Sequence, residues 1–390
     1  MKFLLAQINP VVGDLEGNAK KILCTASKAS SNSADLVLTP ELSLWGYPAN
    51  DLLLKKNLIK YQYQILDQLA LDIYKKHGNL SITVGIAEII NDSFFPNLYN
   101  SIALLERGEW KIIARKIILP TYEVFDEKRY FRSEEKVSVL IKQIKNKTWR
   151  LGFTICEDLW VNKNIEGRGI HKENPISDLK KKKVDILVNL SASPYTFKKL
   201  ELRSKVSSFA AKYLQVPLIY VNQIGANDNL IFDGNSFILD KNGSKIKQLK
   251  SFSEDFSSWD IEKTKPQKNK FEKSEMSSIF DALVLGVKDY AQKCGFKTAL
   301  IGLSGGIDSA LVSAIATAAL GSKNIYCVSM PSKWSSPHSK SDAKDLASRL
   351  KINFNSIPIE NLMSSFEESF INTISFEMAE ITNQNIQSRI

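Results

Sequence analysis

The residues around two consecutive glycines, Gly305 and Gly306, have the types and order that can hold a phosphate group. The apolar run at 298–303 predicts a buried strand, and residues 310–320 predict a helix that ends at Gly321. A turn between them points backbone N–H groups at an anion, and glycines allow a close approach. A Gly-Gly pair alone is often only a tight turn. The full strand-loop-helix order favours a phosphate loop made of Gly302, Leu303, Ser304, Gly305, Gly306, Ile307, Asp308 and Ser309.

A second set of reactive residues lies in the first half of the chain. Cys156, Glu41 and Lys116 each follow a different predicted strand, so a thiol, a carboxylate and an amine can meet at one rim of a sheet. A cysteine at a strand-to-helix junction can feel the helix N-terminus, which lowers the pKa of its thiol and favours the nucleophilic thiolate. A single free cysteine is more often an inert core residue. The prediction of a catalytic site therefore depends on the three residues together.

The elements that must position these residues have an α/β pattern. Before residue 250, short apolar strands alternate with polar loops or helices, and a hairpin turns at Asn242-Gly243. The predicted strands are Phe3–Ile8, Asp35–Thr39, Ser81–Ala87, Ser101–Glu106, Lys111–Arg115, Arg150–Ile155, Asp185–Leu190, Leu218–Asn222, Ser236–Asp240 and Ser244–Leu249.

The composition changes after this first domain. Residues 251–274 are polar and predict a linker. Beyond them, a helix at 275–293 leads into the phosphate loop, and a strand at 324–330 alternates with helices near 341–350 and 361–370. This order predicts a doubly wound nucleotide-binding fold, with its ligand at the carboxyl ends of the strands. We therefore predict domains at 1–250 and 275–390, joined by the linker.

Length and composition narrow the class of protein. The 390 residues are enough for two domains, and the four cysteines are too widely spaced to indicate a zinc site or a disulfide framework, which fits a reducing cytoplasm. We find neither a signal peptide nor an apolar run long enough to cross a bilayer. The net charge of +10 comes from scattered lysines, and the run Lys180–Lys183 reads as a solvated helix end. We expect no nucleic-acid and no membrane partner.

Both reactive sets resemble known families. The segment Ser304–Ser309 resembles the S-G-G-x-D-S loop of the N-type ATP pyrophosphatases, and the three catalytic candidates resemble the Glu-Lys-Cys triad of the nitrilase, or carbon-nitrogen hydrolase, superfamily. The surrounding segments resemble the glutamine-dependent NAD synthetases over essentially the whole chain. The resemblance implies a nitrilase-like α-β-β-α sandwich followed by a partial Rossmann-like, doubly wound ATP-pyrophosphatase domain. The segments that carry it are 119–131, 156–160, 191–195, 330–336 and 384–389.

The resemblance implies roles for residues of the first domain. Glu41 would take the proton of Cys156, and the thiolate would attack the side-chain amide of glutamine. Lys116 and a backbone N–H near Glu157 would stabilise the oxyanion. The residues that match glutamine-binding positions are Tyr122, Ser193 and Lys199, whose cation suits an α-carboxylate. From the sequence, Glu123 and Glu157 stay open as groups that orient Lys116 or bind the substrate amine.

The resemblance also implies the chemistry of the second domain. The phosphate loop would cradle ATP, and Asp308 would hold a Mg²⁺ ion. Ammonia from the first site would displace AMP from adenylated deamido-NAD to give NAD. Asn385 matches a position that contacts deamido-NAD, although an asparagine in a polar helix is more often simply solvated. The implied partners are glutamine, deamido-NAD and ATP, and we expect a homo-oligomer.

The chain departs from the family pattern in two places. Lys198-Lys199 replaces the usual Gly-Lys, which predicts a less tight turn before Lys199. The family also continues past the segment at 384–389, so the second domain is expected to be incomplete and to make NAD poorly while glutamine is still hydrolysed. This leaves two alternatives open, a stand-alone glutamine amidase and a glutamine- or nucleotide-binding regulatory module without turnover.

Overall fold

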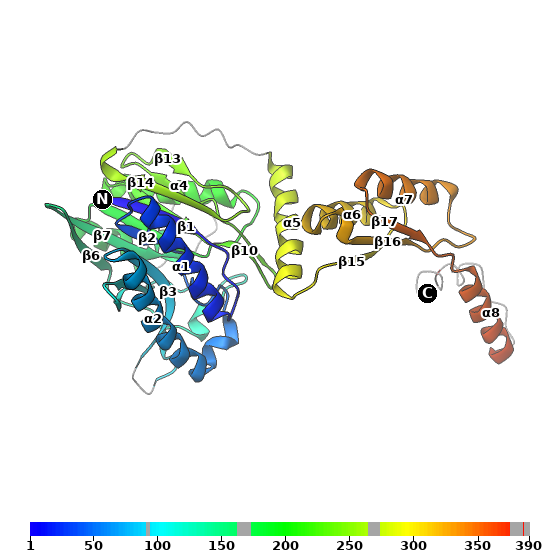
Figure 1. Cartoon of the computed structure of the whole chain (residues 1–390), viewed down its shortest axis with the longest axis horizontal. Helices are drawn as coiled ribbons and strands as arrows, with labels where there is room; N and C mark the ends of the chain where they lie inside the picture. The colour runs from blue at the N-terminus through cyan, green and yellow to red at the C-terminus, as the bar shows by residue number, and fades with distance from the viewer. Residues whose placement is uncertain (91–93, 162–172, 264–273, 375–384, 386–390) are drawn as a thin grey trace. The chain divides into compact units, whose positions relative to one another are not determined.

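The computed structural model describes residues 1–90, 94–161, 173–263, 274–374 and 385. It divides into two compact units, Met1–Ala282 and Leu283–Ile390 (Figure 1). The predicted linker at 251–274 is wrong in its first part, because residues Asp255–Asp260 form a strand that pairs with the N-terminal strand. Residues 264–273 of the predicted linker lie outside the described residues.

Two six-stranded sheets form the centre of the first unit (Figure 1). The first has the order β14-β1-β2-β3-β4-β5, and the second has the order β13-β12-β9-β8-β7-β6. The strands of the first sheet are β1 (Lys2–Gln7), β2 (Leu36–Leu38), β3 (Ser81–Ile89), β4 (Leu98–Glu106), β5 (Glu109–Arg115) and β14 (Asp255–Asp260). Those of the second are β6 (Ser138–Ile144), β7 (Lys147–Ile155), β8 (Ile186–Ser191), β9 (Leu218–Asn222), β12 (Phe237–Leu239) and β13 (Lys245–Gln248).

Helices cover the outer faces of both sheets, as the core clusters show. Side chains of α1 and α2 share one core with one face of the first sheet, and those of α3 and α4 share another with the second sheet. A third core joins the two sheets, with Phe3 and Phe153 among its members. The helices are α1 (Leu15–Ser31), α2 (Lys56–His77), α3 (Pro175–Lys181) and α4 (Lys199–Leu214). The predicted α-β-β-α sandwich is confirmed.

Alternating burial explains why each strand serves two cores. In β1, Leu4 packs toward the helices whereas Phe3 and Leu5 pack toward the second sheet, because successive side chains of a strand point to opposite faces. The sequence analysis found most strands but missed β6, β14 and the small hairpin of β10 (Ile224–Asn227) and β11 (Leu230–Asp233). These missed strands are short or carry polar residues, so their apolar alternation is weak.

The second unit contains a three-stranded parallel sheet in the order β15-β16-β17. A small core that includes Leu303, Ile325 and Cys327 joins this sheet to α6 and α7. The predicted helices and strands at 275–330 are confirmed, whereas β17 was missed. The boundary between the units falls within α5 (Glu275–Lys293), and the elements that follow it are β15 (Ala299–Gly302), α6 (Ile307–Leu320), β16 (Ile325–Ser329), α7 (Pro337–Leu350), β17 (Asn353–Ser356) and α8 (Glu360–Ile374).

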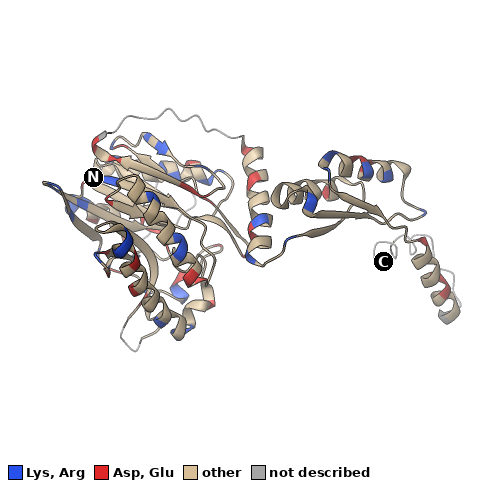
Figure 2. Ribbon diagram, in the orientation of Figure 1, with Lys and Arg blue, Asp and Glu red and all other residues tan. Residues whose placement is uncertain are grey.

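Charge is spread over the elements of both units. Figure 2 shows basic positions interspersed with acidic ones along helices and strands, as the scattered lysines of the sequence indicate. Lys180 and Lys181 are exposed in the last turn of α3, and Lys182 and Lys183 follow it at the surface, so the predicted solvated helix end is confirmed. Among the described helices, not one has the length and apolar character needed to span a membrane.

Candidate active site and phosphate loop

The three catalytic candidates lie just after strands of the two facing sheets. Glu41 follows β2, Lys116 follows β5, and Cys156 opens the short 3-10 helix η3 (Cys156–Leu159) directly after β7. Their exposed fractions are 1%, 0% and 5%, so all three are buried. The ammonium nitrogen of Lys116 lies 2.7 Å from Oε1 of Glu41, and the Cys156 thiol interacts electrostatically with both charges. The structure therefore brings the three predicted residues into one cluster.

A second carboxylate, from Glu127, completes this cluster. Nζ of Lys116 lies 2.7 Å from Oε1 of Glu127 as well as 2.7 Å from Glu41, and the hydroxyl of Tyr47 donates to the same Glu127 oxygen at 2.8 Å. Oε2 of Glu127 is buried and has no hydrogen-bond partner within the described residues. The sequence analysis missed Glu127. Its only signal was its position in the matched segment 119–131, where it looks like one of several surface charges.

The position of Glu41 is fixed by three neighbours. Nδ2 of Asn100 on β4 donates to Oε1 of Glu41 at 2.7 Å, and the backbone N–H of Ala192 donates to Oε2 at 2.9 Å. Gly85 on β3 lets the loop pass closely, since a Cβ atom there would lie 2.2 Å from the backbone nitrogen of Leu42. Both carboxylate oxygens of Glu41 are therefore oriented before any substrate binds.

The electrostatics of the cluster favour a charged lysine and a neutral thiol. Burial alone would lower the pKa of Lys116, but the carboxylates of Glu127 and Glu41 outweigh it and raise that pKa well above 10.5. Burial, together with the charge of Glu41, raises the pKa of Cys156 well above its ordinary value. The expected lowering of the thiol pKa is wrong, because η3 has only four residues and desolvation is the larger effect. The thiol therefore needs a base to remove its proton, and Glu41 is the carboxylate with the largest effect on its pKa.

The predicted glutamine-binding residues lie on two loops and at the start of a helix. The hydroxyl of Tyr122 donates to Oε2 of Glu157 at 2.9 Å. Ser193 is buried, and its backbone N–H donates to Oδ1 of Asn222 at 2.8 Å. Lys199 begins α4, with its ammonium nitrogen 5.1 Å from the centre of the Trp160 ring. A role of these residues in glutamine binding stays a prediction.

The turn before Lys199 is closed by a backbone hydrogen bond. Lys198 has φ 60° and ψ 9°, a left-handed conformation that favours glycine. The N–H of Lys199 still donates to the carbonyl of Thr196 at 3.0 Å. This hydrogen bond shows no loosening of the turn. Lys198 instead adopts a left-handed backbone conformation that is strained for a residue with a side chain.

The predicted phosphate loop connects β15 to α6. Gly305 has φ 86°, and a Cβ atom there would lie 2.2 Å from the carbonyl oxygen of Ser339, so only glycine fits. The hydroxyls of Ser304 and Ser309 lie 3.1 Å apart across the loop. A cavity of about 220 Å³ adjoins the start of the loop. It is lined by Gly302, Leu303, Ser304, Val328, Ser329, Met330, Pro331, Ser335, Ser339 and Lys340.

Asp308 lies in the first turn of α6 and is exposed. Among the described residues, no three His, Cys, Asp or Glu side chains gather into a group that could hold a metal ion. A single exposed carboxylate next to a phosphate loop fits Mg²⁺, because this ion is usually held by one or two carboxylates, substrate phosphates and water. Asn385 is helical and exposed, but the residues on both sides of it lie outside the described part of the chain. Its contact with deamido-NAD therefore stays a prediction.

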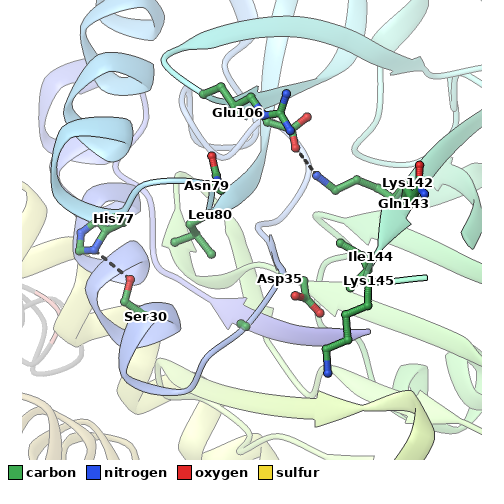
Figure 3. Close-up of a pocket in the computed structure, with 12 residues that line it drawn as sticks. Ser30, Asp35, His77, Asn79, Leu80, Glu106, Lys142, Gln143, Ile144 and Lys145 are labelled. Atoms are coloured by element: carbon green, nitrogen blue, oxygen red, sulfur yellow. Dashed lines mark hydrogen bonds and ion pairs between the residues drawn. The ribbon is translucent and has the colours of Figure 1, made fainter. Parts of the chain in front are cut away.

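A larger cavity of the first unit, of about 550 Å³, lies away from the catalytic cluster (Figure 3). Asp35 and Leu80 on its wall precede β2 and β3, whereas Glu41 follows β2, so the cavity is at the opposite ends of these strands. The ion pair between Lys142 and Glu106 joins the two sheets on this wall. This cavity is therefore separate from the catalytic cluster.

Comparison with known proteins agrees with the division into two units. Residues 5–266 match the carbon-nitrogen hydrolase family and residues 279–390 match the NAD synthase family. The solved structure of an amidase of the nitrilase superfamily from Nesterenkonia has a TM-score of 0.54 over 67% of this chain and 90% of its own, at 18% identity, which shows a shared fold. The class of protein is therefore a carbon-nitrogen hydrolase unit joined to an NAD synthase unit.

Whole-chain relatives define the family. The glutamine-dependent NAD(+) synthetase of Synechocystis sp. is 42% identical over 99% of this chain and 69% of its own length. That of Thermotoga maritima is 35% identical over 100% of this chain and 70% of its own length. The Acinetobacter baumannii enzyme, solved in complex with ADP, has a TM-score of 0.87 at 34% identity, covering 100% of this chain and 70% of its own. The chain belongs to the glutamine-dependent NAD(+) synthetases.

Proposed function

We propose that this protein converts deamido-NAD to NAD with ATP and with ammonia released from glutamine. The observation that carries the proposal is the buried cluster of Glu41, Lys116 and Cys156 in the same chain as a glycine-rich phosphate loop. The first can release ammonia from an amide, and the second can bind the nucleotide that activates the acceptor. The matches of the two units to the carbon-nitrogen hydrolase and NAD synthase families support both the release of ammonia and the use of ATP.

In the first unit, Glu41 removes the proton of the Cys156 thiol, and the sulfur attacks the carbonyl carbon of the glutamine side chain. Lys116, held between two carboxylates, faces the negative charge that develops on the carbonyl oxygen. The carbon-nitrogen bond then breaks, and the leaving nitrogen takes the proton from Glu41 to become ammonia. Water, deprotonated by Glu41, hydrolyses the thioester, and the proton returns to the sulfur as glutamate leaves.

Tyr122, Ser193 and Lys199 are the proposed glutamine-binding residues. The cation of Lys199 suits the α-carboxylate, and Ser193 directly follows Ala192, whose backbone N–H donates to Glu41. Glu157 holds the Tyr122 hydroxyl in place, and its carboxylate is the proposed partner of the substrate amine.

In the second unit, the N–H groups at the start of α6 bind the phosphates of ATP. The carboxylate of deamido-NAD attacks the α-phosphorus and releases pyrophosphate; ammonia then attacks the adenylated carbonyl and AMP leaves. Asp308 would hold Mg²⁺, which neutralises phosphate charge when it is bound. Asn385 is the proposed contact to deamido-NAD. We also propose that the protein forms a homo-oligomer. Its four free cysteines favour a reducing compartment, and we propose that it is cytoplasmic.

The test is to measure glutamate release and NAD formation on one preparation, with either glutamine or ammonium chloride as nitrogen source. Glutamate release from glutamine together with ATP-dependent NAD formation from both sources would support the proposal. Glutamate release without NAD from either source would leave only an amidase. Tight binding of glutamine or ATP without any turnover would show a regulatory module instead.

A further inference from the structure

The catalytic cluster draws its lysine and its cysteine from different sheets. Lys116 follows β5 of the first sheet, and Cys156 follows β7 of the second. These two sheets are joined by side-chain packing rather than by strand pairing. Something must therefore fix the distance between the two chain segments, because a misplacement of 1 Å in a catalytic site can reduce the rate by about 100-fold.

The carboxylate of Asp158 bonds to both of these segments. Oδ1 accepts the backbone N–H of Ile117 at 3.1 Å and that of Ile118 at 2.8 Å, while Oδ2 accepts the N–H of Ile155 at 2.9 Å. Ile117 directly follows Lys116, and Ile155 directly precedes Cys156. One short side chain therefore bridges the two catalytic segments through their backbones.

The Asp158 carboxylate accepts three backbone hydrogen bonds in a buried position, where a charge is unfavourable unless it is hydrogen-bonded. Asp158 is 1% exposed, and hydrogen bonds to an ionised acceptor are about twice as strong as neutral ones. Burial raises the pKa of Asp158 to about 6, although the three backbone N–H groups and Lys116 oppose that rise. Glu41 and Glu127 bind the ammonium group of Lys116. Its backbone N–H donates to the carbonyl of Asn100 and its carbonyl accepts the N–H of Glu134, so these bonds tie it to segments other than that of Cys156. Asp158 is the side chain that links the backbone next to Lys116 with the backbone next to Cys156.

We propose that Asp158 is a positioning residue that holds Lys116 and Cys156 at their working separation by binding the backbone of their chain neighbours. The inference rests on the proposed glutamine hydrolysis, since it assigns the separation to that reaction. It predicts that loss of the bridge slows catalysis more than it weakens glutamine binding, because the proposed glutamine-binding residues make other contacts.

The variant Asp158→Asn tests this inference, because its amide group presents a donor to at least one backbone N–H. We expect kcat for glutamine hydrolysis at pH 7.5 to fall by about 10- to 100-fold, with KM changed less than about threefold. The matched control is Asp185→Asn, whose carboxylate accepts the N–H of Arg150 at 2.7 Å near the other end of β7. This control should retain wild-type kcat.

The pH profile separates positioning from simple destabilisation. As pH falls from 7.5 to 5, Asp158 of the wild type takes up a proton and loses an acceptor, whereas the side-chain amide of the Asp158→Asn variant does not titrate. The ratio of wild-type to variant kcat should therefore shrink by about tenfold for a group with a pKa of about 6. A variant with wild-type kcat overturns the proposal.

Hydrogen exchange gives a readout that does not need glutamine turnover. In folded Asp158→Asn, peptides covering 114–120 and 153–160 should lose protection together, while Asp185→Asn leaves both protected. If the wild type releases no glutamate, the proposed function fails. The exchange result would still show whether Asp158 holds the two backbone segments together. If Asp158→Asn does not fold, Asp158→Glu retains the charge and displaces the oxygens; wild-type kcat and protection in that variant would overturn the proposal.

Discussion

The candidate sites of the two units differ in their exposure to solvent. In the first, Glu41, Lys116 and Cys156 are at most 5% exposed and are held by ion pairs and backbone hydrogen bonds. In the second, the phosphate loop is open, with Asp308 exposed and Ile307 82% exposed. Charges in a buried site interact far more strongly than charges in water. The hydrolase site is therefore formed and shielded from water before substrate binds, whereas the phosphate loop is held by its own hydrogen bonds and leaves its carboxylate in contact with solvent.

The strongest way to separate the units is Cys156→Ala. We expect it to abolish glutamate release, because the buried cluster has no other thiol among the described residues to form the thioester. NAD formation from ammonium chloride should survive, since that ammonia does not come from the first unit. Both products are measured on the same preparation. Glutamate release at a wild-type rate would contradict the assignment of the nucleophile.

Lys116→Met tests how far the buried cluster depends on its lysine cation. The change leaves Glu41 and Glu127 buried without their partner, and breaking a buried pair typically costs about 3–5 kcal/mol. Glutamine hydrolysis should fall by about 100-fold or more, as for loss of an oxyanion donor. Urea unfolding and steady-state kinetics give the two quantities.

A double variant sharpens this prediction. Burial raises the pKa of Glu127 to about 7 even beside Lys116, and loss of that cation raises it further. Adding Glu127→Gln to Lys116→Met should therefore return part of the unfolding free energy at alkaline pH, where the carboxyl is otherwise charged, while the activity does not return. Full additivity of the two changes would contradict the coupling that the contacts indicate, because neighbours in one ion network rarely act independently.

Asp308→Asn should affect nucleotide binding but neither stability nor glutamine hydrolysis, because Asp308 is exposed and lies in the second unit. Weaker binding of ATP with Mg²⁺, by about tenfold, is expected because the amide is a poorer ligand for a hard cation. Stability should change by less than about 0.5 kcal/mol, as for most surface substitutions, and glutamine hydrolysis should be unchanged. Titration calorimetry measures the affinity. Asp345→Asn, at an exposed carboxylate paired with Arg349, is the control, and equal affinities in the two variants would contradict the metal role.

The smallest expected effect concerns the turn before α4. Lys198→Gly relieves a left-handed conformation that costs a side chain roughly 1–2 kcal/mol, but glycine also gains freedom in the unfolded chain. A net gain of about 0.5 kcal/mol in unfolding free energy is expected. Lys182→Gly, at a residue with φ −80°, should give no gain. A loss of stability in Lys198→Gly would show that the lysine side chain compensates for its strained backbone.

Local patterns in the sequence determined the outline of both units. Apolar runs located most strands, and the order of glycines and hydroxyls located the loop before α6. Three reactive residues after three strands indicated a meeting point, and Lys116 and Glu41 do form an ion pair. The predicted single rim is wrong for Cys156, because β7 belongs to the second sheet. These features are visible because they depend on neighbours within a few positions of the chain.

Tertiary structure decided what depends on distant neighbours. The pairing of β14 with β1 joins segments about 250 residues apart, and a polar strand of this kind has no strong local signal. Glu127 and Asn100 reach the cluster from separate segments, so only the fold distinguishes them from ordinary polar residues. The direction of the Cys156 pKa was also decided by the fold, because burial and surrounding charges act together on a thiol whose local sequence indicates the reverse.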